Sequence, residues 1–266
     1  MQLFNKIALI TGAGKGIGKA IAEGFAKEGA TVILNELHGA TYVEAVSKEI
    51  ILRGGKSEVY YADISKVPEI RALFQYVQSK YNRLDILVNN AGITGWSDFF
   101  DTDETIFDTV INLNIKGTLF CSIEAAKIMR QHKSGSIINI SSICSVLSVK
   151  NLICYSTSKG GIEAMAKQIA IELAPYNIRV NTFAPGAINT DRNLLEDPDY
   201  RANWGSVIPM QRTGEPEEMI GPALFLASDA SSFVTGQFFS VDGGWSVQGK
   251  FSEKSMDNQL KNTKDK

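Results

Sequence analysis

Short apolar runs alternate with amphipathic stretches along most of the chain. Residues 7–10 are apolar without a break, a pattern typical of a strand buried on both faces of a parallel sheet. The next segment carries Ile17, Ile21 and Phe25 at helical spacing and ends at Gly29. The alternation continues, and it predicts further strands at residues 31–35, 59–62, 84–88, 136–140, 178–181 and 237–241.

This order of elements predicts an α/β fold of the doubly wound, Rossmann type. Strands joined by helical crossovers form a seven-stranded, mostly parallel sheet with helices on both faces and right-handed connections. We expect a single domain over residues 1–250, because no repeat or linker interrupts the pattern there. Residues 251–266 are predicted to form a polar, loosely attached C-terminal tail.

Composition and charge exclude several classes of protein. The 266 residues are 44% hydrophobic, enough for one well-buried core. The net charge of −2, from 27 basic and 29 acidic residues, gives no electrostatic case for a nucleic-acid or membrane partner. No apolar run is long enough to span a bilayer, and the N-terminus lacks a signal-peptide pattern, so we expect a cytoplasmic location.

The cysteines and histidines predict neither a disulfide framework nor a metal site. Cys121, Cys144 and Cys154 form no CxxC pair, and His38 and His132 lie far apart in the sequence. We therefore expect no bound metal.

A glycine-rich turn connects the first strand to the first helix. Residues 11–18 read TGAGKGIG, with glycines at positions 12, 16 and 18 among others. Such glycines let the backbone approach a pyrophosphate, whose charge is stabilised by the amides and dipole of the helix N-terminus. A plain tight turn has a similar composition, so the motif alone leaves both interpretations open.

Tyr155 and Lys159 are the pair with the clearest candidate chemistry. At positions i and i+4 of a helix, they project from the same face and can share one pocket. A free tyrosine, with a pKa of about 10, is a poor base at neutral pH, but a nearby ammonium favours the phenolate and lowers that pKa. Such a pair can move a proton to or from an alcohol oxygen. The spacing also occurs by chance in helices, so the surrounding motifs decide its meaning.

Taken together, the motifs resemble those of the short-chain dehydrogenase/reductase family from about residue 6 to residue 245. The glycine spacing is similar to the family's TGxxxGxG, and Ser142, Tyr155 and Lys159 stand at the family spacing. Further matches follow in the family's order: NNAG at 89–92, Asn114 within NLNIKG, PG at 185–186, INT at 188–190 and DGG at 242–244. Each motif is weak alone, and their joint order is specific.

The resemblance implies a proton relay made of Asn114, Ser142, Tyr155 and Lys159. Tyr155 would be the general acid in reduction and the general base in oxidation, and Lys159 would lower its pKa and bind the nicotinamide ribose. Ser142 would hold the substrate oxygen, and Asn114 would seat a water. The implied cofactor-binding residues are Gly12, Lys15, Gly16, Ile17, Gly18, Glu36, Asp63, Ile64, Asn90, Ala91, Gly92, Tyr155, Lys159, Pro185, Gly186, Ile188 and Thr190.

The resemblance favours NAD over NADP as the cofactor. Glu36 ends the second predicted strand, where a carboxylate accepts both adenosine ribose hydroxyls and repels a 2′-phosphate. Lys15 indicates the opposite preference, because NADP-preferring relatives often carry a basic residue before this glycine. Both side chains would also suit a solvated loop and strand end. Asp63 and Ile64 follow the third strand, and the aspartate is expected to contact the adenine.

The predicted substrate is a sugar or polyol. Residues 190–212 are expected to form a lid whose polar composition favours a hydroxylated substrate, although each single charge also suits a solvent-facing surface. Residues 185–190, 208–210 and 214–218 resemble bacterial glucose 1-dehydrogenases, and residues 221–231 resemble gluconate 5-dehydrogenases. The rival within the family is a 3-oxoacyl-acyl-carrier-protein reductase. Lys133 would then help to hold the acidic carrier near the pocket mouth, with Tyr176 in place of a second basic residue.

Two expectations concern other classes and assembly. A non-catalytic, NAD(H)-binding regulatory protein is the alternative from another class, and the intact catalytic set disfavours it. The resemblance implies a homotetramer, with contacts through the helices around 106–130 and 155–174 and through the closing strand. The expected partner is a small-molecule alcohol or ketone, with no nucleic acid and no membrane.

Overall fold

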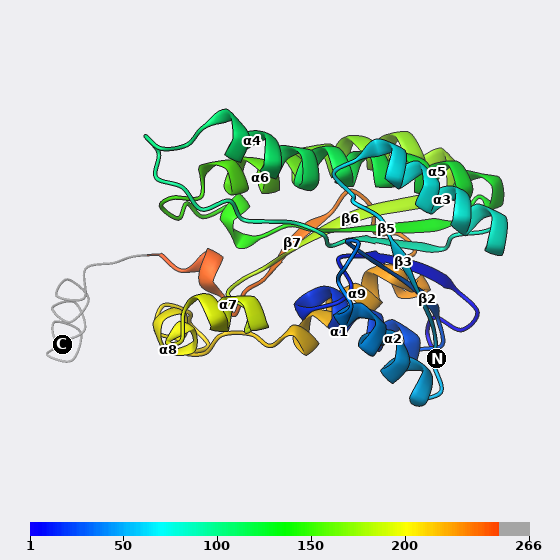
Figure 1. The fold of residues 1–266 in the computed structure, drawn as a ribbon, viewed down its shortest axis with the longest axis horizontal. Coiled ribbons are helices and arrows are strands. Elements are labelled where there is room, and N and C mark those ends of the chain that lie inside the picture. Colours follow the sequence, from blue (N-terminus) through cyan, green and yellow to red (C-terminus); the bar gives the residue numbers. More distant parts are fainter. Residues whose placement is uncertain (250–266) are drawn as a thin grey trace, which may run out of the picture.

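All seven predicted strands are present in the structure, a computed structural model that describes residues 1–249 (Figure 1). They are β1 (Ile7–Thr11), β2 (Thr31–Glu36), β3 (Lys56–Tyr61), β4 (Ile86–Asn89), β5 (Gly135–Ile140), β6 (Ile178–Pro185) and β7 (Phe238–Val241). They form one sheet in the order β3-β2-β1-β4-β5-β6-β7, and every neighbouring pair is parallel. The prediction of a doubly wound α/β fold is confirmed.

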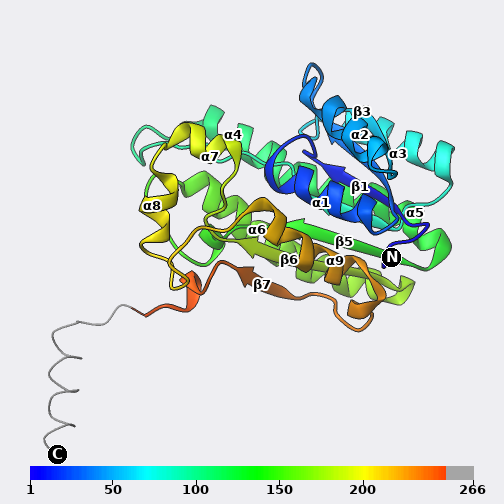
Figure 2. The same ribbon diagram turned by 90° about the horizontal axis from the view of Figure 1, so that it is seen from below.

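Helices cover both faces of the sheet, as the two views in Figures 1 and 2 show. One layer contains α1 (Gly16–Lys27), α2 (Tyr42–Leu52) and α9 (Ile220–Ala227), and the other contains α3 (Val67–Tyr81), α5 (Thr118–His132) and α6 (Ile153–Leu173). Along β1, Ile10 packs in the first core and Leu9 in the second, and both are fully buried. Because successive strand residues face opposite layers, a strand covered on both sides is apolar throughout.

The strand order fixes where a ligand can bind. β1 lies between β2 and β4, so the chain leaves β1 toward one side of the sheet and later crosses from β3 to the other side. The loops after β1 and β4 therefore diverge at the carboxyl ends of their strands. Open α/β sheets bind their ligands in the crevice at this point.

Most strand ends lie within two residues of the prediction, and two strands extend further than that. β3 begins at Lys56 rather than at residue 59, because this edge strand is only partly buried and its polar residues hide its start. β6 continues to Pro185 rather than to residue 181, since it pairs with both β5 and β7. The buried, polar Thr182 interrupts the apolar pattern that would have shown this continuation.

The long helix expected around residues 106–130 consists of three segments. α4 (Glu104–Ile111) leads into a π-helical segment (Asn112–Gly117), which leads into α5. Wider helical turns of this kind occur frequently at functional sites. Here the π-helical segment carries Asn114, one of the predicted catalytic residues.

The predicted lid at residues 190–212 contains two short helices, α7 (Asp191–Glu196) and α8 (Tyr200–Gly205). Both lie at the same end of the molecule as α4 (Figures 1 and 2). Within residues 1–249, no helix is long and apolar enough to cross a membrane. The polar tail predicted for residues 251–266 lies outside the described residues, and the domain limits stay a prediction.

Candidate active site

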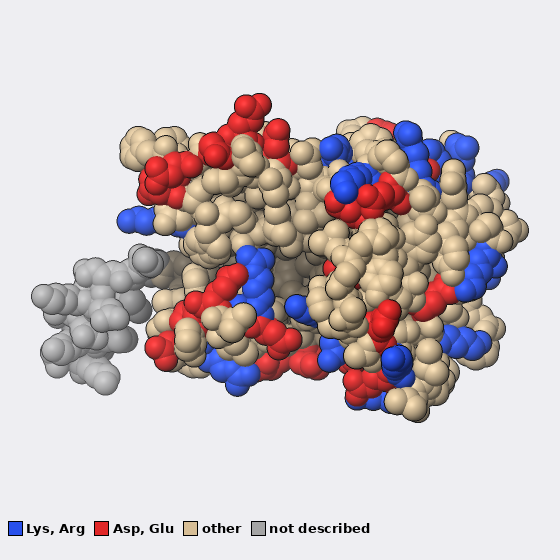
Figure 3. All heavy atoms as spheres, viewed as in Figure 1, with Lys and Arg blue, Asp and Glu red and all other residues tan. Residues whose placement is uncertain are grey.

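A cleft of about 1030 Å³ opens at the carboxyl edge of the sheet. Figure 3 shows it as a hollow between the two layers of the molecule. Its walls come from the loops that follow the first six strands and from α4 and the lid, so one site gathers residues that are distant in the sequence. This volume is at the upper end of the range for small-molecule and cofactor sites.

Most of the predicted site residues line this cleft. They are Gly12, Lys15, Gly16, Ile17, Glu36, Asp63, Ile64, Asn90, Ala91, Gly92, Ser142, Tyr155, Lys159, Pro185, Gly186, Ile188 and Thr190. Gly18 and Asn114 are buried behind the wall instead. A side chain at Gly18 would lie 2.3 Å from the Gly12 carbonyl oxygen, so a glycine here lets α1 pack closely against the turn.

The loops after β1 and β4 are fastened together by Thr11 and Asn90. Thr11 Oγ1 accepts hydrogen bonds from the backbone N–H groups of Asn90 and Ala91, each at 3.0 Å. Asn90 Nδ2 donates to the carbonyl oxygens of Thr11 and Gly12, each at 2.9 Å. These bonds hold the glycine turn, in which Gly12 has a φ of 63°, against the β4 loop.

Asn114 connects the β4 loop to α6. Its Oδ1 accepts from the Ile93 N–H and its Nδ2 donates to the Ile93 carbonyl oxygen, both at 3.0 Å. Nδ2 also donates to Ser158 Oγ at 2.9 Å, and Ser158 Oγ donates to the Tyr155 carbonyl oxygen at 2.7 Å. Asn114 is therefore placed to position the turn of α6 that carries Tyr155, and its predicted water stays a prediction.

The β5 loop and α6 bring Ser142, Tyr155 and Lys159 to the same cleft. Ser142 caps a short 3₁₀ turn, and its Oγ accepts from the Cys144 N–H at 3.2 Å. Lys159 Nζ lies 5.5 Å from the centre of the Tyr155 ring, as expected for positions i and i+4 of a helix. Lys159 is buried, and its Nζ donates to the Ile140 carbonyl oxygen at 2.8 Å.

Burial shifts the pKa values of Tyr155 and Lys159 in opposite directions. It raises the pKa of Tyr155 to about 12, although the hydrogen bond with Ser142 and the charge of Arg192 both act to lower it. It lowers the pKa of Lys159 to about 8. Lost solvation is thus the largest effect on Tyr155, and the expectation that Lys159 lowers the pKa of Tyr155 stays a prediction. At neutral pH Tyr155 is a neutral phenol.

Glu36 and Lys15 line the part of the cleft beside α1 and α2. Glu36 Oε2 accepts from the Gly14 N–H at 3.2 Å, and its Oε1 accepts from the Leu37 N–H at 3.1 Å. Lys15 Nζ lies 3.9 Å from the centre of the Tyr42 ring, within the range of a cation–π contact. Each charge thus has a defined partner in the protein.

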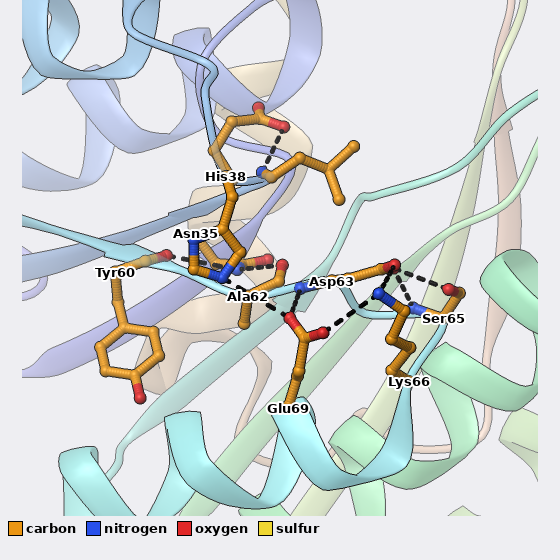
Figure 4. A network of polar contacts seen from close by, with 10 residues as sticks. Asn35, His38, Tyr60, Ala62, Asp63, Ser65, Lys66 and Glu69 are labelled. Atoms are coloured by element: carbon orange, nitrogen blue, oxygen red, sulfur yellow. Dashed lines mark hydrogen bonds and ion pairs between the residues drawn. The ribbon is translucent and has the colours of Figure 1, made fainter.

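The loop after β3 is part of the polar network of Figure 4, which also includes Asn35 of β2 and Glu69 of α3. Asp63 Oδ1 accepts from the N–H and the Oγ of Ser65 at 2.9 and 2.7 Å, and Lys66 Nζ lies 3.2 Å from Asp63 Oδ2. Burial acts to raise the pKa of Asp63, but the contacts with Ser65 and Lys66 outweigh it and lower that pKa. The carboxylate is already bonded within the protein, so the predicted contact with adenine stays a prediction.

Hydrogen bonds and aromatic contacts hold the two helices of the lid in place. Thr190 caps α7, its Oγ1 accepting from the Asn193 N–H at 3.3 Å. Asn193 Nδ2 donates to Tyr200 Oη at 3.2 Å, which joins the two helices. Tyr200, Trp204 and Trp245 then form an aromatic row, with successive ring centres 6.0 and 5.3 Å apart.

Several residues of the cleft were not predicted as site residues. Arg192 is the most informative, because its place in the predicted lid left open whether its charge faces solvent, and the side chain lines the cleft and donates to Thr94. The others are Asn35, Leu37, Tyr42, Ala62, Ser65, Ile93, Thr94, Glu104, Thr105, Asp108, Thr109, Asn112, Leu113, Ile140, Ser141, Asp191 and Asn193. Those between residues 104 and 112 recur at helical spacing, a polar stripe that the sequence could have revealed.

Lys159→Met is expected to remove a pH dependence of stability between pH 8 and 10. The folded chain loses the Lys159 proton above about pH 8, whereas the unfolded chain keeps it to about pH 10.5. The free energy of unfolding should therefore rise with pH across this window, by about 1 kcal/mol per pH unit more than in the variant. Urea unfolding at pH 8, 9 and 10 measures both slopes. Lys167→Met, at an exposed position of the same helix, should keep the native slope, and equal slopes in the native chain and Lys159→Met would contradict the lowered pKa.

Comparison with known proteins assigns the family. The model of a family described as enoyl-(acyl carrier protein) reductase matches residues 12–246. A 3-oxoacyl-(acyl-carrier-protein) reductase from Thermotoga maritima is 41% identical over 244 residues, which cover 92% of this chain and 99% of the relative.

Two solved structures extend this similarity to the fold. One, from Agrobacterium tumefaciens and provisionally described as a gluconate dehydrogenase, has a TM-score of 0.89 at 34% identity and covers 93% of this chain and 98% of its own. The other, from Beutenbergia cavernae, is provisionally described as an NAD(P)-dependent gluconate 5-dehydrogenase with NADP bound at low occupancy. Its TM-score is 0.88 at 34% identity, over 93% of this chain and 99% of its own. The chain therefore belongs to the short-chain dehydrogenase/reductase family and is an oxidoreductase that acts on CH–OH groups.

Proposed function

We propose that this chain is a dehydrogenase that interconverts a secondary alcohol and its carbonyl compound, with NAD as the preferred cofactor and a sugar or polyol as the substrate. The observation that carries the proposal is the meeting of Ser142, Tyr155 and Lys159 in one cleft. A hydroxyl, a phenol and an ammonium at one place can orient an alcohol oxygen and exchange its proton.

As a member of this family the chain uses NAD or NADP. At Gly12, an added side chain would meet Ala91 Cα at 3.0 Å, so glycine lets the turn lie close against the β4 loop. In the proposal, the N-terminus of α1 holds the pyrophosphate, Glu36 the adenosine ribose and Lys159 the nicotinamide ribose. When bound, the nicotinamide supplies the hydride acceptor for oxidation and the donor for reduction.

Tyr155 exchanges the proton of the substrate oxygen. In reduction, the neutral phenol donates its proton to the oxygen as negative charge develops there, and in oxidation the phenolate takes the hydroxyl proton back. Ser142 orients the same oxygen by a hydrogen bond, and the Lys159 ammonium stabilises the phenolate. Asn114 holds Ser158 and, through it, the turn of α6 on which Tyr155 lies.

The polar lining of the cleft supports a hydroxylated substrate. α4 contributes Glu104, Thr105, Asp108 and Thr109, and the lid contributes Asp191, Arg192 and Asn193. These side chains can bond several hydroxyl groups, whereas a steroid or a long acyl chain would leave them without partners.

A 3-oxoacyl-acyl-carrier-protein reductase is the second candidate, and the identity of 41% to such an enzyme favours it. The carrier-binding role expected of Lys133 finds no support in this chain. Lys133 and Tyr176 come directly before β5 and β6, at the amino edge of the sheet, and neither lines the cleft at the carboxyl edge. Glu36 also opposes the 2′-phosphate of NADPH, the usual cofactor of reductive biosynthesis.

A homotetramer is part of the proposal. Apolar side chains are exposed on α4 and α6, where Phe107 is 45% and Ile171 72% exposed, and Phe233 before β7 is fully exposed. Symmetric contacts through such faces would bury them. Sedimentation equilibrium should give about four times the chain mass of 29.0 kDa. A mass of one chain at micromolar concentration would contradict the assembly.

Tyr155→Phe is expected to lower kcat by about 10³-fold on any accepted alcohol, because it removes the exchangeable proton and keeps the ring. The dissociation constant of NADH, measured by fluorescence titration, should change less than about threefold. Tyr176→Phe, at an exposed position outside the cleft, serves as the matched control and should retain full activity. Tight NADH binding with no turnover of any alcohol or ketone by the native chain would instead support the non-catalytic regulatory protein.

Glu36→Ala is expected to shift the cofactor preference from NAD toward NADP. The native carboxylate accepts ribose hydroxyls and repels a 2′-phosphate, so its loss should weaken NAD binding about tenfold and strengthen NADP binding. Calorimetric titration with both cofactors measures the change. Glu49→Ala, on the exposed side of α2, controls for the loss of one negative charge. If the native chain already binds NADP more tightly than NAD, the assignment of NAD is wrong and Lys15 determines the cofactor preference.

A further inference from the structure

Arg192 is a cation that the lid contributes to the cleft. Among the described residues that line the cleft, the cations are Lys15, Lys159 and Arg192. Lys15 packs on the Tyr42 ring, and Lys159 is buried with its Nζ on a backbone carbonyl. Arg192 lies on the first turn of α7, and 46% of its side chain is exposed. It is thus the cation of the lid that an incoming substrate can reach.

The guanidinium of Arg192 is held in place by only some of its N–H donors. Nη2 donates to Thr94 Oγ1 at 2.6 Å, and Nε donates to Glu196 Oε1 at 2.7 Å. Thr94 belongs to the loop after β4, so the first bond joins the lid to the opposite wall of the cleft. An arginine has five N–H donors, and within residues 1–249 the remaining ones donate to no protein atom.

Arg192 also lies within electrostatic range of the reacting group. Its positive charge acts to lower the pKa of Tyr155, against the larger effect of burial. No carboxylate is among the charges that act on Tyr155 in the described part of the chain. A negative group of a substrate held at Tyr155 would therefore meet a positive neighbour on the lid.

We propose that Arg192 binds a carboxylate of the substrate, so that, among sugars and polyols, the substrate is one that carries an acid group rather than a neutral one. This inference rests on the proposed alcohol oxidation and narrows its substrate class. The planar fork of a guanidinium matches both oxygens of a carboxylate. The polar residues of α4 that line the cleft, among them Glu104 and Asp108, accept hydroxyl hydrogens, which favours an acid with several hydroxyl groups.

Matched pairs of substrates test the inference. Gluconate and sorbitol differ at one terminal carbon, a carboxylate in the first and a CH₂OH in the second. Acetoacetate and ethyl acetoacetate give the same contrast in the reductive direction. We expect the native chain to prefer the acid of each pair. Arg192→Gln should lower kcat/KM for the acids by about 10- to 100-fold and for the neutral partners by less than about threefold.

Three further measurements make the result decisive. Arg192→Lys should recover part of the lost preference, since it keeps the charge and loses the fork. Arg201→Gln, on α8 and outside the cleft, should change neither member of a pair. The dissociation constant of NADH should stay within about threefold in Arg192→Gln, because the proposal assigns Arg192 to the substrate.

Some outcomes overturn this inference alone, and one overturns the proposed function with it. If acids and neutral partners lose kcat/KM equally in Arg192→Gln, or if NADH binding weakens by the same factor, Arg192 fastens the lid or binds the cofactor instead. A native chain that turns over neutral alcohols and rejects acids also contradicts the inference. The proposed alcohol oxidation is then still supported. If the native chain turns over no alcohol or ketone of either kind, the proposed function fails and this inference fails with it.

Discussion

The hydrogen bonds between Thr11 and Asn90 are the contact on which the rest of the site depends. β1 and β4 are neighbours in the sheet, yet their loops lead to helices on opposite faces. Without a fastening, the glycine turn and the β4 loop would be free to separate. The hydroxyl and amide of these two side chains close this gap with four bonds of 2.9–3.0 Å. The two loops thereby form one wall of the cleft.

The sequence was sufficient for the sheet and for most of the cleft, because both follow from strong local patterns. A strand buried on both faces must be apolar, and loops at one edge of a parallel sheet must meet. The hydrophobic pattern did not predict the structure where tertiary contacts determine it. Lys56 belongs to an edge strand that is half exposed, and Thr182 is a buried polar residue of β6. The π-helical segment with Asn114 is six residues long and lies between two α-helices.

The pKa values of the site residues, which depend on solvation, were harder to predict than the positions of these residues. Spacing correctly placed Tyr155 beside Lys159, but it carried no information on how deeply both are buried, and burial decides the direction of their pKa shifts. The direction of the Arg192 side chain was equally hidden, since it depends on Thr94, which is distant in the sequence. Both features bear on the proposed function, because one keeps Tyr155 a neutral phenol and the other brings a cation into the cleft.

A crystal structure of the chain with NAD tests the central claim most directly, since the account places every step in one cleft. We predict electron density along its length, with the adenosine ribose hydroxyls on Glu36, the pyrophosphate at the N-terminus of α1 and the nicotinamide ribose on Lys159. The nicotinamide ring should then face the space bounded by Ser142, Tyr155 and Arg192. Density for NAD at any other place, or a nicotinamide ring remote from Tyr155, would contradict the account.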